Sequence, residues 1–415
     1  MRLFESERSG KLYQKVLELA GIFYNAGGRA LLVGGAVRDS LSGRRVKDFD
    51  LEIHDLAPER VLELLREVCE VDTVGMSFGV IKVKHLELDI SLPRKENKIG
   101  KGHRGFLVEV DPELSIADAA ARRDFTVNAI MYDPLTEELL DPHGGVKDLE
   151  KGILRHVSCH FSEDPLRVLR GMQFASRLEF TFAPETVALC RQISQEELAQ
   201  ERIGTEWEKL FLQSKKPSAG LKFLKDCSWI KFYPELEALP QDEWQKTLCL
   251  MDSCAASRSG ERRSDLLFMC GAAVNALTPA GAECFCRRLW NRNELIADIV
   301  ELAAAFQEEI GASARTVPEI RRLALRLKGV KLLCSLLECA GEKDKAYAIA
   351  GAAKECGVWE NAPKALLTGR HCIEAGVSPG EKMGELLKKC FEAQLDGVFD
   401  TVDEGRRYLQ KLLKS

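Results

Sequence analysis

Several features that mark membrane, secreted and metal-structured proteins are missing from this chain. It has no run of about 18 apolar residues, so no membrane span is expected. Its N-terminal segment, MRLFESERSGKLYQKVLELA, is too charged for a secretory signal. The 14 cysteines are irregularly spaced and include no CxxC pair, which predicts reduced thiols and neither a zinc site nor a disulfide framework. We therefore expect a cytoplasmic protein with no membrane partner.

An excess of positive charge is also missing. The formal net charge is −5, so bulk charge gives no support for nucleic-acid binding. Any RNA contact must come from local basic patches, such as Arg321 and Arg322 with Arg326 and Lys328, or residues 94–104. The 415 residues, of which 45% are hydrophobic and 30% charged, fit a globular protein of about two to four domains.

Hydrophobic periodicity divides the chain into a mixed N-terminal part and a helical remainder. The mixed part alternates helical and strand-like runs, at residues 12–26, 29–34, 49–53, 61–69 and 79–92. Residues 94–106 are basic and contain three glycines, so we expect a mobile loop there. From about Pro165 onward almost every segment has helical period. These patterns predict an α/β head followed by a long helical body.

Residues 31–56, LLVGGAVRDSLSGRRVKDFDLEIHDL, carry the strongest chemical signal. The apolar run ends in Gly34 and Gly35, which lack Cβ atoms, and the helix start that follows favours an anion. Asp48 and Asp50 are two residues apart on a strand-like run, so their side chains point to one face. Two such carboxylates repel each other unless a cation lies between them, and hard oxygen ligands suit Mg²⁺. Phosphate beside carboxylate-bound Mg²⁺ is typical of phosphoryl or nucleotidyl transfer.

A third carboxylate would complete a two-metal site. Asp89, in LELDISL, is flanked by apolar residues and is expected on a neighbouring strand. Glu87 shares its face by parity and is the competing candidate. We favour Asp89, and the alternative is that both are ordinary residues on a polar strand face.

Residues 122–130, RRDFTVNAI, form a second candidate site. Clustered arginines beside an aspartate can hold a nucleotide, with Arg122 and Arg123 on phosphate or ribose oxygens and Asp124 on a ribose hydroxyl. The competing interpretation is a surface ion pair ahead of a helix.

Residues 163–170, EDPLRVLR, suggest a way to read a base. Pro165 suits the first turn of a helix, so Asp164 is expected near its N-cap, with Arg167 and Arg170 on the same face. A carboxylate only accepts hydrogen bonds and a guanidinium only donates them. Cytosine and adenine each offer an amino donor beside a ring-nitrogen acceptor, which fits the pair, whereas uracil and guanine are mismatched twice. The competing interpretation is a capping aspartate with exposed basic residues.

Together these segments resemble class II tRNA nucleotidyltransferases, the bacterial CCA-adding and poly(A) polymerase family. The matching motifs are GGAVRDSLSG with KDFDLE, RRDFTVNA, DPHGGVKDL, EDPLRVLR and ERIGTEW, in the family's order. The last of these is amphipathic, with Trp207, Leu210 and Phe211 at core-like spacing, and is expected to support the site. Residues 366–397 resemble the family's tail segment more weakly.

The resemblance implies an α+β fold, with a polymerase-β-like nucleotidyltransferase head followed by an all-helical neck, body and tail. The implied boundaries are 1–150 for the head, 151–215 for the neck with its base-recognition helix, 216–330 for the body and 331–415 for a tRNA-binding tail.

The resemblance also implies roles for individual residues. Asp48 and Asp50 would hold Mg²⁺, with Asp89 as the third catalytic carboxylate. The nucleotide would be held by Gly35 and Arg38 at the triphosphate, by Arg123 with Asp124, and by Asp164, Arg167 and Arg170 around the base.

The chain departs from the family pattern at two places. Where the family commonly has another arginine, three residues beyond Arg170, this chain has Gln173. Some members also carry a metal-dependent HD phosphohydrolase domain, but Lys246, Cys270 and Gly271 occupy positions where its ligands would be expected. We predict a degenerate helical domain without hydrolase activity.

The implied reaction is attack of a tRNA 3′-hydroxyl on the α-phosphorus of CTP or ATP, with release of pyrophosphate. Residues 94–106, including Glu96 and Lys98, are the candidate for the element that changes the pocket between C and A. Partial CC- or A-adding enzymes and poly(A) polymerases share all of these motifs, and a catalytically silent RNA-binding protein is an alternative from another class. The sequence does not indicate the oligomeric state.

Overall fold

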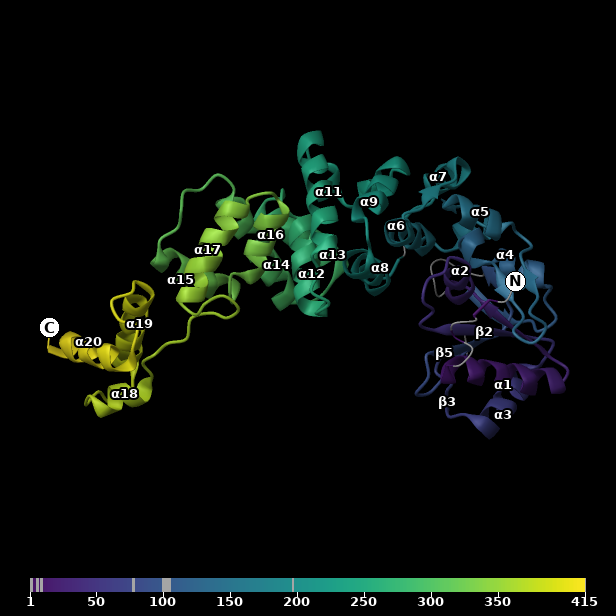
Figure 1. Ribbon diagram of the computed structural model, residues 1–415, viewed down its shortest axis with the longest axis horizontal. Coiled ribbons are helices and arrows are strands. Elements are labelled where there is room, and N and C mark those ends of the chain that lie inside the picture. Colours follow the sequence, from purple (N-terminus) through teal and green to yellow (C-terminus); the bar gives the residue numbers. More distant parts are fainter. Residues whose placement is uncertain are drawn as a thin grey trace. The chain divides into compact units, whose positions relative to one another are not determined.

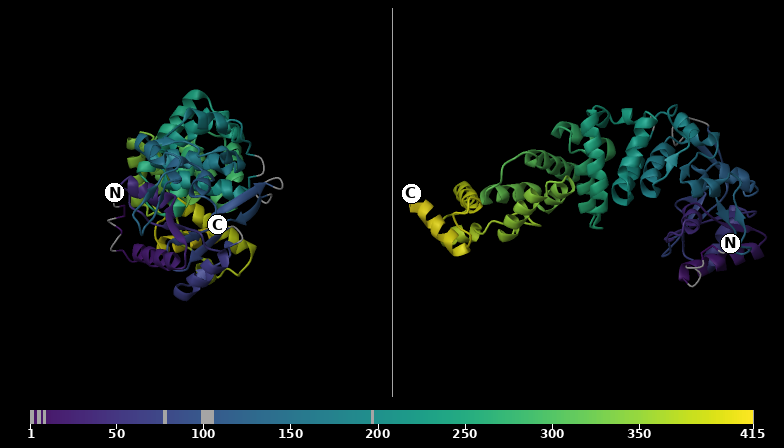
Figure 2. Two further views of the ribbon diagram at one scale, coloured as in Figure 1. Left: turned by 90° about the vertical axis from the view of Figure 1, so that its right-hand side faces the viewer. Right: turned by 45° about the horizontal axis from the view of Figure 1, so that its top comes forward.

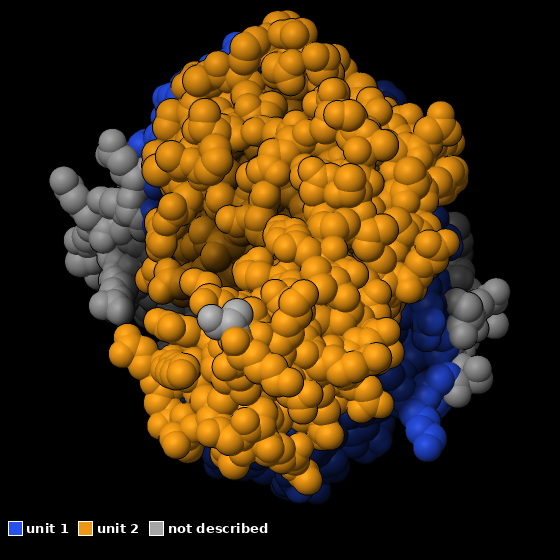
Figure 3. Space-filling view, turned by 90° about the vertical axis from the view of Figure 1, so that its left-hand side faces the viewer, with its two compact units in different colours: residues 1–210, 219–232 blue, residues 211–218, 233–415 orange. Residues whose placement is uncertain are grey.

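The computed structural model describes residues 3–4, 7, 10–76, 79–98, 106–195 and 198–414, and these divide into two compact units. Unit 1 comprises Met1–Leu210 and Ala219–Phe232, and unit 2 comprises Phe211–Ser218 and Tyr233–Ser415 (Figure 3). The finer division into head, neck, body and tail stays a prediction.

Unit 1 is built on a seven-stranded mixed sheet with the strand order β3-β4-β5-β2-β1-β8-β9. Its strands are β1 (Arg29–Val33), β2 (Phe49–His54), β3 (Val71–Asp72), β4 (Val80–Val83), β5 (Leu88–Ser91), β8 (Met131–Tyr132) and β9 (Leu139–Leu140). β1 pairs antiparallel with β2, and β2 pairs parallel with β5. The parallel pair in the middle of the sheet sets Asp50 and Asp89 opposite each other.

Helices cover both faces of this sheet. On one face α1 (Lys11–Asn25) and α3 (Pro58–Val68) pack on Leu32, Leu51 and other buried residues (Figure 1). On the other face Leu31 and Val33 pack with residues of α4 (Ile116–Ala121). Successive side chains of β1 therefore alternate between two cores, as the period of a strand requires. The helical and strand-like runs expected in this part of the sequence are confirmed.

The segment that was expected to be a loop at residues 94–106 is partly regular. β6 (Arg94–Lys98) pairs antiparallel with β7 (Phe106–Val110), and these two strands form a sheet of their own (Figure 2). Backbone pairing outweighs the glycine content of the segment, because the two ends of the turn can hydrogen-bond to each other. Residues 99–105, at its centre, lie outside the described residues.

The remainder of unit 1 is mainly helical. It contains α2 (Gly35–Leu41), α5 (Gly145–Lys151), α6 (Leu166–Leu178), α7 (Pro184–Cys190) and most of α8 (Gln200–Gln213) and α9 (Pro217–Asp226). The all-helical neck needs a small correction, because β10 (Ile153–Leu154) and β11 (Thr181–Phe182) pair in parallel within it. Their pairing lets Phe182 join Phe125 and Phe223 in an aromatic cluster.

All of the regular secondary structure in the described part of unit 2 is helical. Its helices are α10 (Pro234–Glu237), α11 (Gln241–Ala256), α12 (Arg262–Ala273), α13 (Pro279–Leu289), α14 (Asn293–Glu309), α15 (Val317–Leu327), α16 (Lys331–Cys339), α17 (Lys343–Glu355), α18 (Gly369–Glu374), α19 (Glu381–Leu395) and α20 (Val402–Lys414). The last three helices enclose a separate apolar cluster around Leu367, Leu386 and Leu409. The α+β fold with a helical continuation is confirmed. Within the described part of the chain, no helix is both long and apolar enough to cross a membrane.

Gly145 offers a test of how tightly unit 1 is packed. A Cβ atom added there would overlap the backbone carbonyl of Thr126, which belongs to the segment of residues 122–130. We expect Gly145→Ala to lower the free energy of unfolding by about 1–3 kcal/mol, measured by urea denaturation. Gly21→Ala is the matched control, because Gly21 lies inside α1 with open space around it. That change should raise stability by about 0.5–1 kcal/mol, and equal effects of the two changes would contradict the packing argument.

Candidate active site

One open cavity of unit 1, with a volume of about 620 Å³, is lined by every residue that the sequence analysis selected. These are Gly35, Arg38, Asp48, Asp50, Asp89, Arg123, Asp124, Asp164, Arg167 and Arg170. They come from β2, β5, α2, α6 and the segment after α4, which are far apart in sequence. The structure brings them together around one space, while their individual roles stay predictions.

Three carboxylates face one end of this cavity. Asp50 lies on β2, Asp89 is its register partner on β5, and Asp48 immediately precedes β2 instead of lying on it. The Asp50 side chain is open to the cavity, but the surrounding protein still desolvates it. This burial, together with the negative charges of Asp48 and Asp89, raises the pKa of Asp50 to about 6, against the opposing effect of Arg123.

Asp89 and Glu87, the two candidates for the third carboxylate, lie in different places. Glu87 precedes β5, and its backbone carbonyl accepts a hydrogen bond from the Phe49 amide at 3.0 Å. Glu87 does not line the cavity, whereas Asp89 does. Asp89 also lies 3.5 Å from the ammonium of Lys82, a neighbour on β4.

The carboxylates fit a divalent cation that takes some of its ligands from the protein and the others from a substrate. Among the described residues, no three His, Cys, Asp or Glu side chains are grouped closely enough to hold a metal by themselves. Mg²⁺ characteristically keeps several waters and binds through one or two carboxylates plus substrate phosphates. Burial is the main cause of the raised pKa of Asp50, and a bound cation would relieve the repulsion from Asp48 and Asp89 that adds to it.

The paired glycines bring the backbone close to the charged groups. Gly34 has φ 71° and ψ −131°, and a Cβ there would lie 3.5 Å from Asp50 Oδ2 and 3.6 Å from an Arg123 nitrogen. A side chain at this position would be strained and would narrow the space between the two charges. The buried Arg38, one turn along α2, donates to Asp39 at 2.8 Å.

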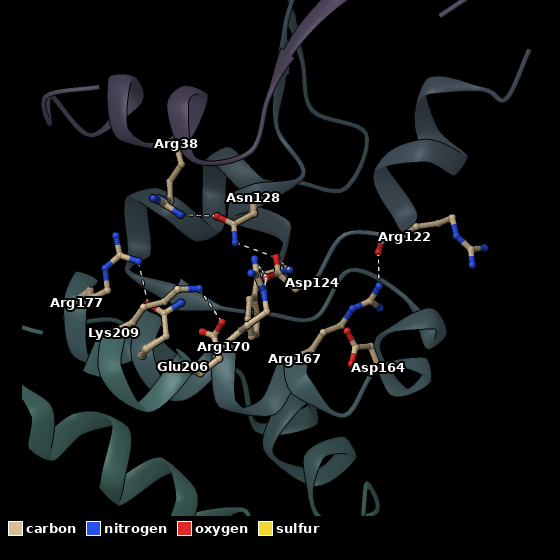
Figure 4. Close-up of polar contacts among 12 residues, drawn as sticks. Arg38, Arg122, Asp124, Asn128, Asp164, Arg167, Arg170, Arg177, Glu206 and Lys209 are labelled. Atoms are coloured by element: carbon tan, nitrogen blue, oxygen red, sulfur yellow. Dashed lines mark hydrogen bonds and ion pairs between the residues drawn. The ribbon is translucent and has the colours of Figure 1, made fainter. Parts of the chain in front are cut away.

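The RRDFTVNA segment contributes a largely buried polar network, and its first residue, Arg122, forms a partly exposed ion pair with Glu163 at 3.3 Å. Arg123 donates to the buried Glu52 at 2.8 Å. Asp124 accepts hydrogen bonds from the Phe125 amide, from Asn128 and from Arg170, so both of its oxygens are engaged (Figure 4). Burial raises the pKa of Asp124, but Arg170 and these hydrogen bonds outweigh it, and the pKa lies below its ordinary value. In this arrangement Asp124 orients Arg170.

The EDPLRVLR segment starts α6 slightly differently from the expectation. Pro165 is the N-cap residue and not a first-turn residue, and Asp164 accepts a hydrogen bond from the Leu166 amide at 3.1 Å. Arg167 donates to the backbone oxygens of His160 and Arg122, so its guanidinium is fixed by the protein backbone. Asp164 and Arg167 line the same cavity (Figure 4).

Sequence reasoning missed several lining residues, above all those of α8. Arg202 forms an ion pair with Asp164 at 2.8 Å, and Lys209 binds Glu206 at 2.7 Å. Arg202 and Lys209 line the cavity, while Trp207 on the opposite face is fully buried, as expected. Arg202 and Lys209 are seven residues apart, which is about two helical turns, so they lie on one face of α8. That spacing was the sequence signal that could have identified them as lining residues. Asn128, Gln173, Phe174 and Arg177 also line the cavity and were not selected as binding residues.

The basic patch at 321–328 is not a free positive surface. Each of its four cations forms an ion pair within unit 2: Arg321 with Asp400, Arg322 with Asp396 and Glu392, Arg326 with Glu308 and Glu301, and Lys328 with Asp298 and Glu294. These carboxylates neutralise the positive charge of the patch, and an RNA contact there stays a prediction.

Among the described residues, none of the positions compared with an HD domain belongs to a group of His, Cys, Asp or Glu side chains that could hold a metal ion. Lys246 forms ion pairs with Asp242 and Glu243 on α11, while Cys270 and Gly271 are buried within α12. The loss of hydrolase activity stays a prediction.

Comparison with protein families gives two matches. Residues 30–155 match the poly(A) polymerase head domain, and residues 179–239 match a probable RNA and SrmB binding site of polymerase A. The chain is 43% identical over 216 residues to the multifunctional CCA protein of Stenotrophomonas maltophilia strain K279a, and 39% identical over 213 residues to that of Chromobacterium violaceum. Each match covers 50% of this chain and 52% and 51% of the two relatives, so the matched region is about half of their length.

Solved structures are similar over almost the whole chain. The CCA-adding enzyme of Bacillus stearothermophilus in complex with CTP has a TM-score of 0.70 at 23% identity, covering 97% of this chain and 98% of that one. The Thermotoga maritima CCA-adding enzyme complexed with tRNA has a TM-score of 0.65 at 20% identity, covering 99% of both chains. The chain thus has the fold of these enzymes, and its residues 30–155 are similar to the poly(A) polymerase head domain.

Proposed function

We propose that this protein adds C and A nucleotides to the 3′ end of tRNA without a nucleic-acid template, using CTP and ATP. The observation that carries the proposal is the single cavity in which three carboxylates meet Asp164 and Arg167. Such a cavity combines a place for phosphoryl chemistry with a place for reading a base. The similarity to multifunctional CCA proteins and to CCA-adding enzymes supports this choice of reaction.

The carboxylates would act through Mg²⁺. Asp48 and Asp50 are the residues that would hold it, with Asp89 as the third carboxylate. When bound, two Mg²⁺ ions would lower the pKa of the attacking 3′-hydroxyl and neutralise the leaving pyrophosphate. Gly35, Arg38 and Arg123 would position the triphosphate, so that the α-phosphorus lies in line with the hydroxyl.

Asp164 and Arg167 would select the base. The carboxylate accepts from the amino group of cytosine or adenine, and the guanidinium donates to the neighbouring ring nitrogen. Arg202 holds one Asp164 oxygen, and the Arg122 and His160 carbonyls hold Arg167. Both groups are thereby preorganised, which increases the penalty for a base with the opposite pattern.

Partial enzymes that add only CC or only A, and poly(A) polymerases, would use the same cavity and differ in their RNA substrate. A catalytically silent RNA-binding protein is the alternative from another class. The substrates of the proposed reaction imply that the protein acts in the cytoplasm.

The reaction can be tested directly with three RNAs. We expect the full chain, with Mg²⁺, CTP and ATP, to extend tRNA lacking CCA by three nucleotides and tRNA ending in CC by one A, as measured on sequencing gels. Extension of the second RNA alone would indicate an A-adding enzyme, and long tails on unstructured RNA would indicate a poly(A) polymerase. No extension of any RNA would refute the enzymatic proposal.

Asp50→Asn should reduce kcat by about 10³-fold or more, while Asp55→Asn, at an exposed position, should not reduce it.

The selection of the base can be tested separately. Asp164→Ala removes the acceptor for the amino group, so misincorporation of UTP or GTP should rise about 10–100-fold relative to CTP and ATP. The affinity for the triphosphate should change less, because the phosphates bind elsewhere. Competition assays with pairs of nucleotides measure this ratio, and unchanged selectivity would contradict recognition of the base edge by Asp164.

A further inference from the structure

One guanidinium in the cavity is not neutralised by a carboxylate. Arg177, near the end of α6, donates from Nη1 to the side-chain oxygen of Gln173 at 2.9 Å. Gln173 is neutral and 1% exposed, so it orients the guanidinium without reducing its charge. Within the described parts of the chain, no carboxylate forms an ion pair with Arg177.

The carboxylates that act on Arg177 through space are already bound to other cations. Asp39 accepts from Arg38 at 2.8 Å, and Glu206 accepts from Lys209 at 2.7 Å. Arg177 is therefore a half-buried cation whose positive charge is available to bind an anion that enters the cavity.

Other positive charges lie close to Arg177. The guanidinium carbons of Arg38 and Arg170 each lie 5.3 Å from the centre of the Phe174 ring, and that of Arg177 lies 5.8 Å from it. Burial and the charge of Arg38 lower the pKa of Arg177. Guanidiniums gathered around one ring repel each other, and a multivalent anion between them would offset this repulsion by attracting each of them.

We propose that Arg177, oriented by Gln173, binds the polyphosphate of the incoming nucleotide next to Arg38. The inference rests on the proposed function for the identity of the anion. In Figure 4, Arg177 lies on one side of Arg170, and Asp164 with Arg167 lies on the other. A nucleotide whose base meets Asp164 would thus extend its phosphates toward Arg38 and Arg177.

This assignment explains how the chain functions with glutamine at position 173, where an arginine was expected. An arginine there would bring its own charge to the cavity. Gln173 instead supplies an acceptor to a cation one helical turn later, since residues four apart lie on the same helix face. Position 173 thereby becomes a positioning residue, and Arg177 takes the phosphate contact.

The experiment measures binding to the full chain without RNA, by isothermal titration calorimetry in the presence of Mg²⁺. The probes are inorganic tripolyphosphate, CTP and CMP. We expect Arg177→Gln to weaken tripolyphosphate and CTP binding about tenfold, as loss of one charge-assisted contact implies, and to change CMP binding less than twofold. Gln173→Glu, which is nearly isosteric, should weaken tripolyphosphate binding similarly, because a carboxylate there would neutralise Arg177. The surface variant Arg60→Gln is the control for removing an arginine.

Unchanged tripolyphosphate affinity in Arg177→Gln would overturn the inference. So would equal weakening of all three probes, because this would indicate a structural role. If Arg177→Gln does not fold, as judged by circular dichroism, Gln173→Glu decides by the same criteria. The two proposals fail in different ways. If the protein extends no RNA but shows this binding pattern, the proposed function is wrong and the role of Arg177 stands. If the protein adds CCA but neither variant changes tripolyphosphate binding, the proposed function stands and the role of Arg177 is wrong.

Discussion

The ion pair between the buried Asp124 and the partly exposed Arg170 connects the two halves of the site, and the rest of the cavity depends on it. Asp124 belongs to the segment that packs under the sheet, and Arg170 lies on α6. Asn128 donates to Asp124 and accepts from Arg38, so one continuous network runs from α2 to α6 (Figure 4). A buried pair is favourable only when its remaining hydrogen-bonding groups are satisfied, and here the backbone amide of Phe125 and Asn128 meet this condition for Asp124.

The balance of charge in the cavity differs from that of the chain. The protein carries a formal net charge of −5, yet nine basic side chains and seven acidic ones line the cavity. This local excess makes an acidic protein compatible with the polyanionic substrate proposed for it, since field lines in a recessed site are focused by its low-dielectric walls. The acidic residues are also unevenly distributed. Asp48, Asp50 and Asp89 gather at one end, and each of the other four is paired with an arginine.

Much of the fold and most of the site were predictable because they depend on local patterns. The i, i+2 spacing of Asp48 and Asp50 and the apolar flanks of Asp89 needed no tertiary information, and all three line the cavity. The missed residues depend on packing between distant segments. Arg202 reaches Asp164 only because α8 folds against α6, and the pairing of β6 with β7 is a contact across residues that looked like a loop. The ion pairs that neutralise the patch at 321–328 were missed for the same reason, since their partners lie up to 79 residues away.

Under the proposed function, the pair that selects the base cannot also choose between the two bases that it accepts. Cytosine and adenine present the same donor and acceptor to Asp164 and Arg167, so these hydrogen bonds carry no information about which is added. The two residues are also held by Arg202 and by backbone carbonyls, which resist their rearrangement. Adenine has one ring more than cytosine. The choice between the two bases must therefore come from the depth of the cavity around Asp164 and Arg167, which stay in place. Arg94 lines the cavity and also begins β6, so any displacement of the β6–β7 ribbon would alter that wall while leaving the fixed pair in place.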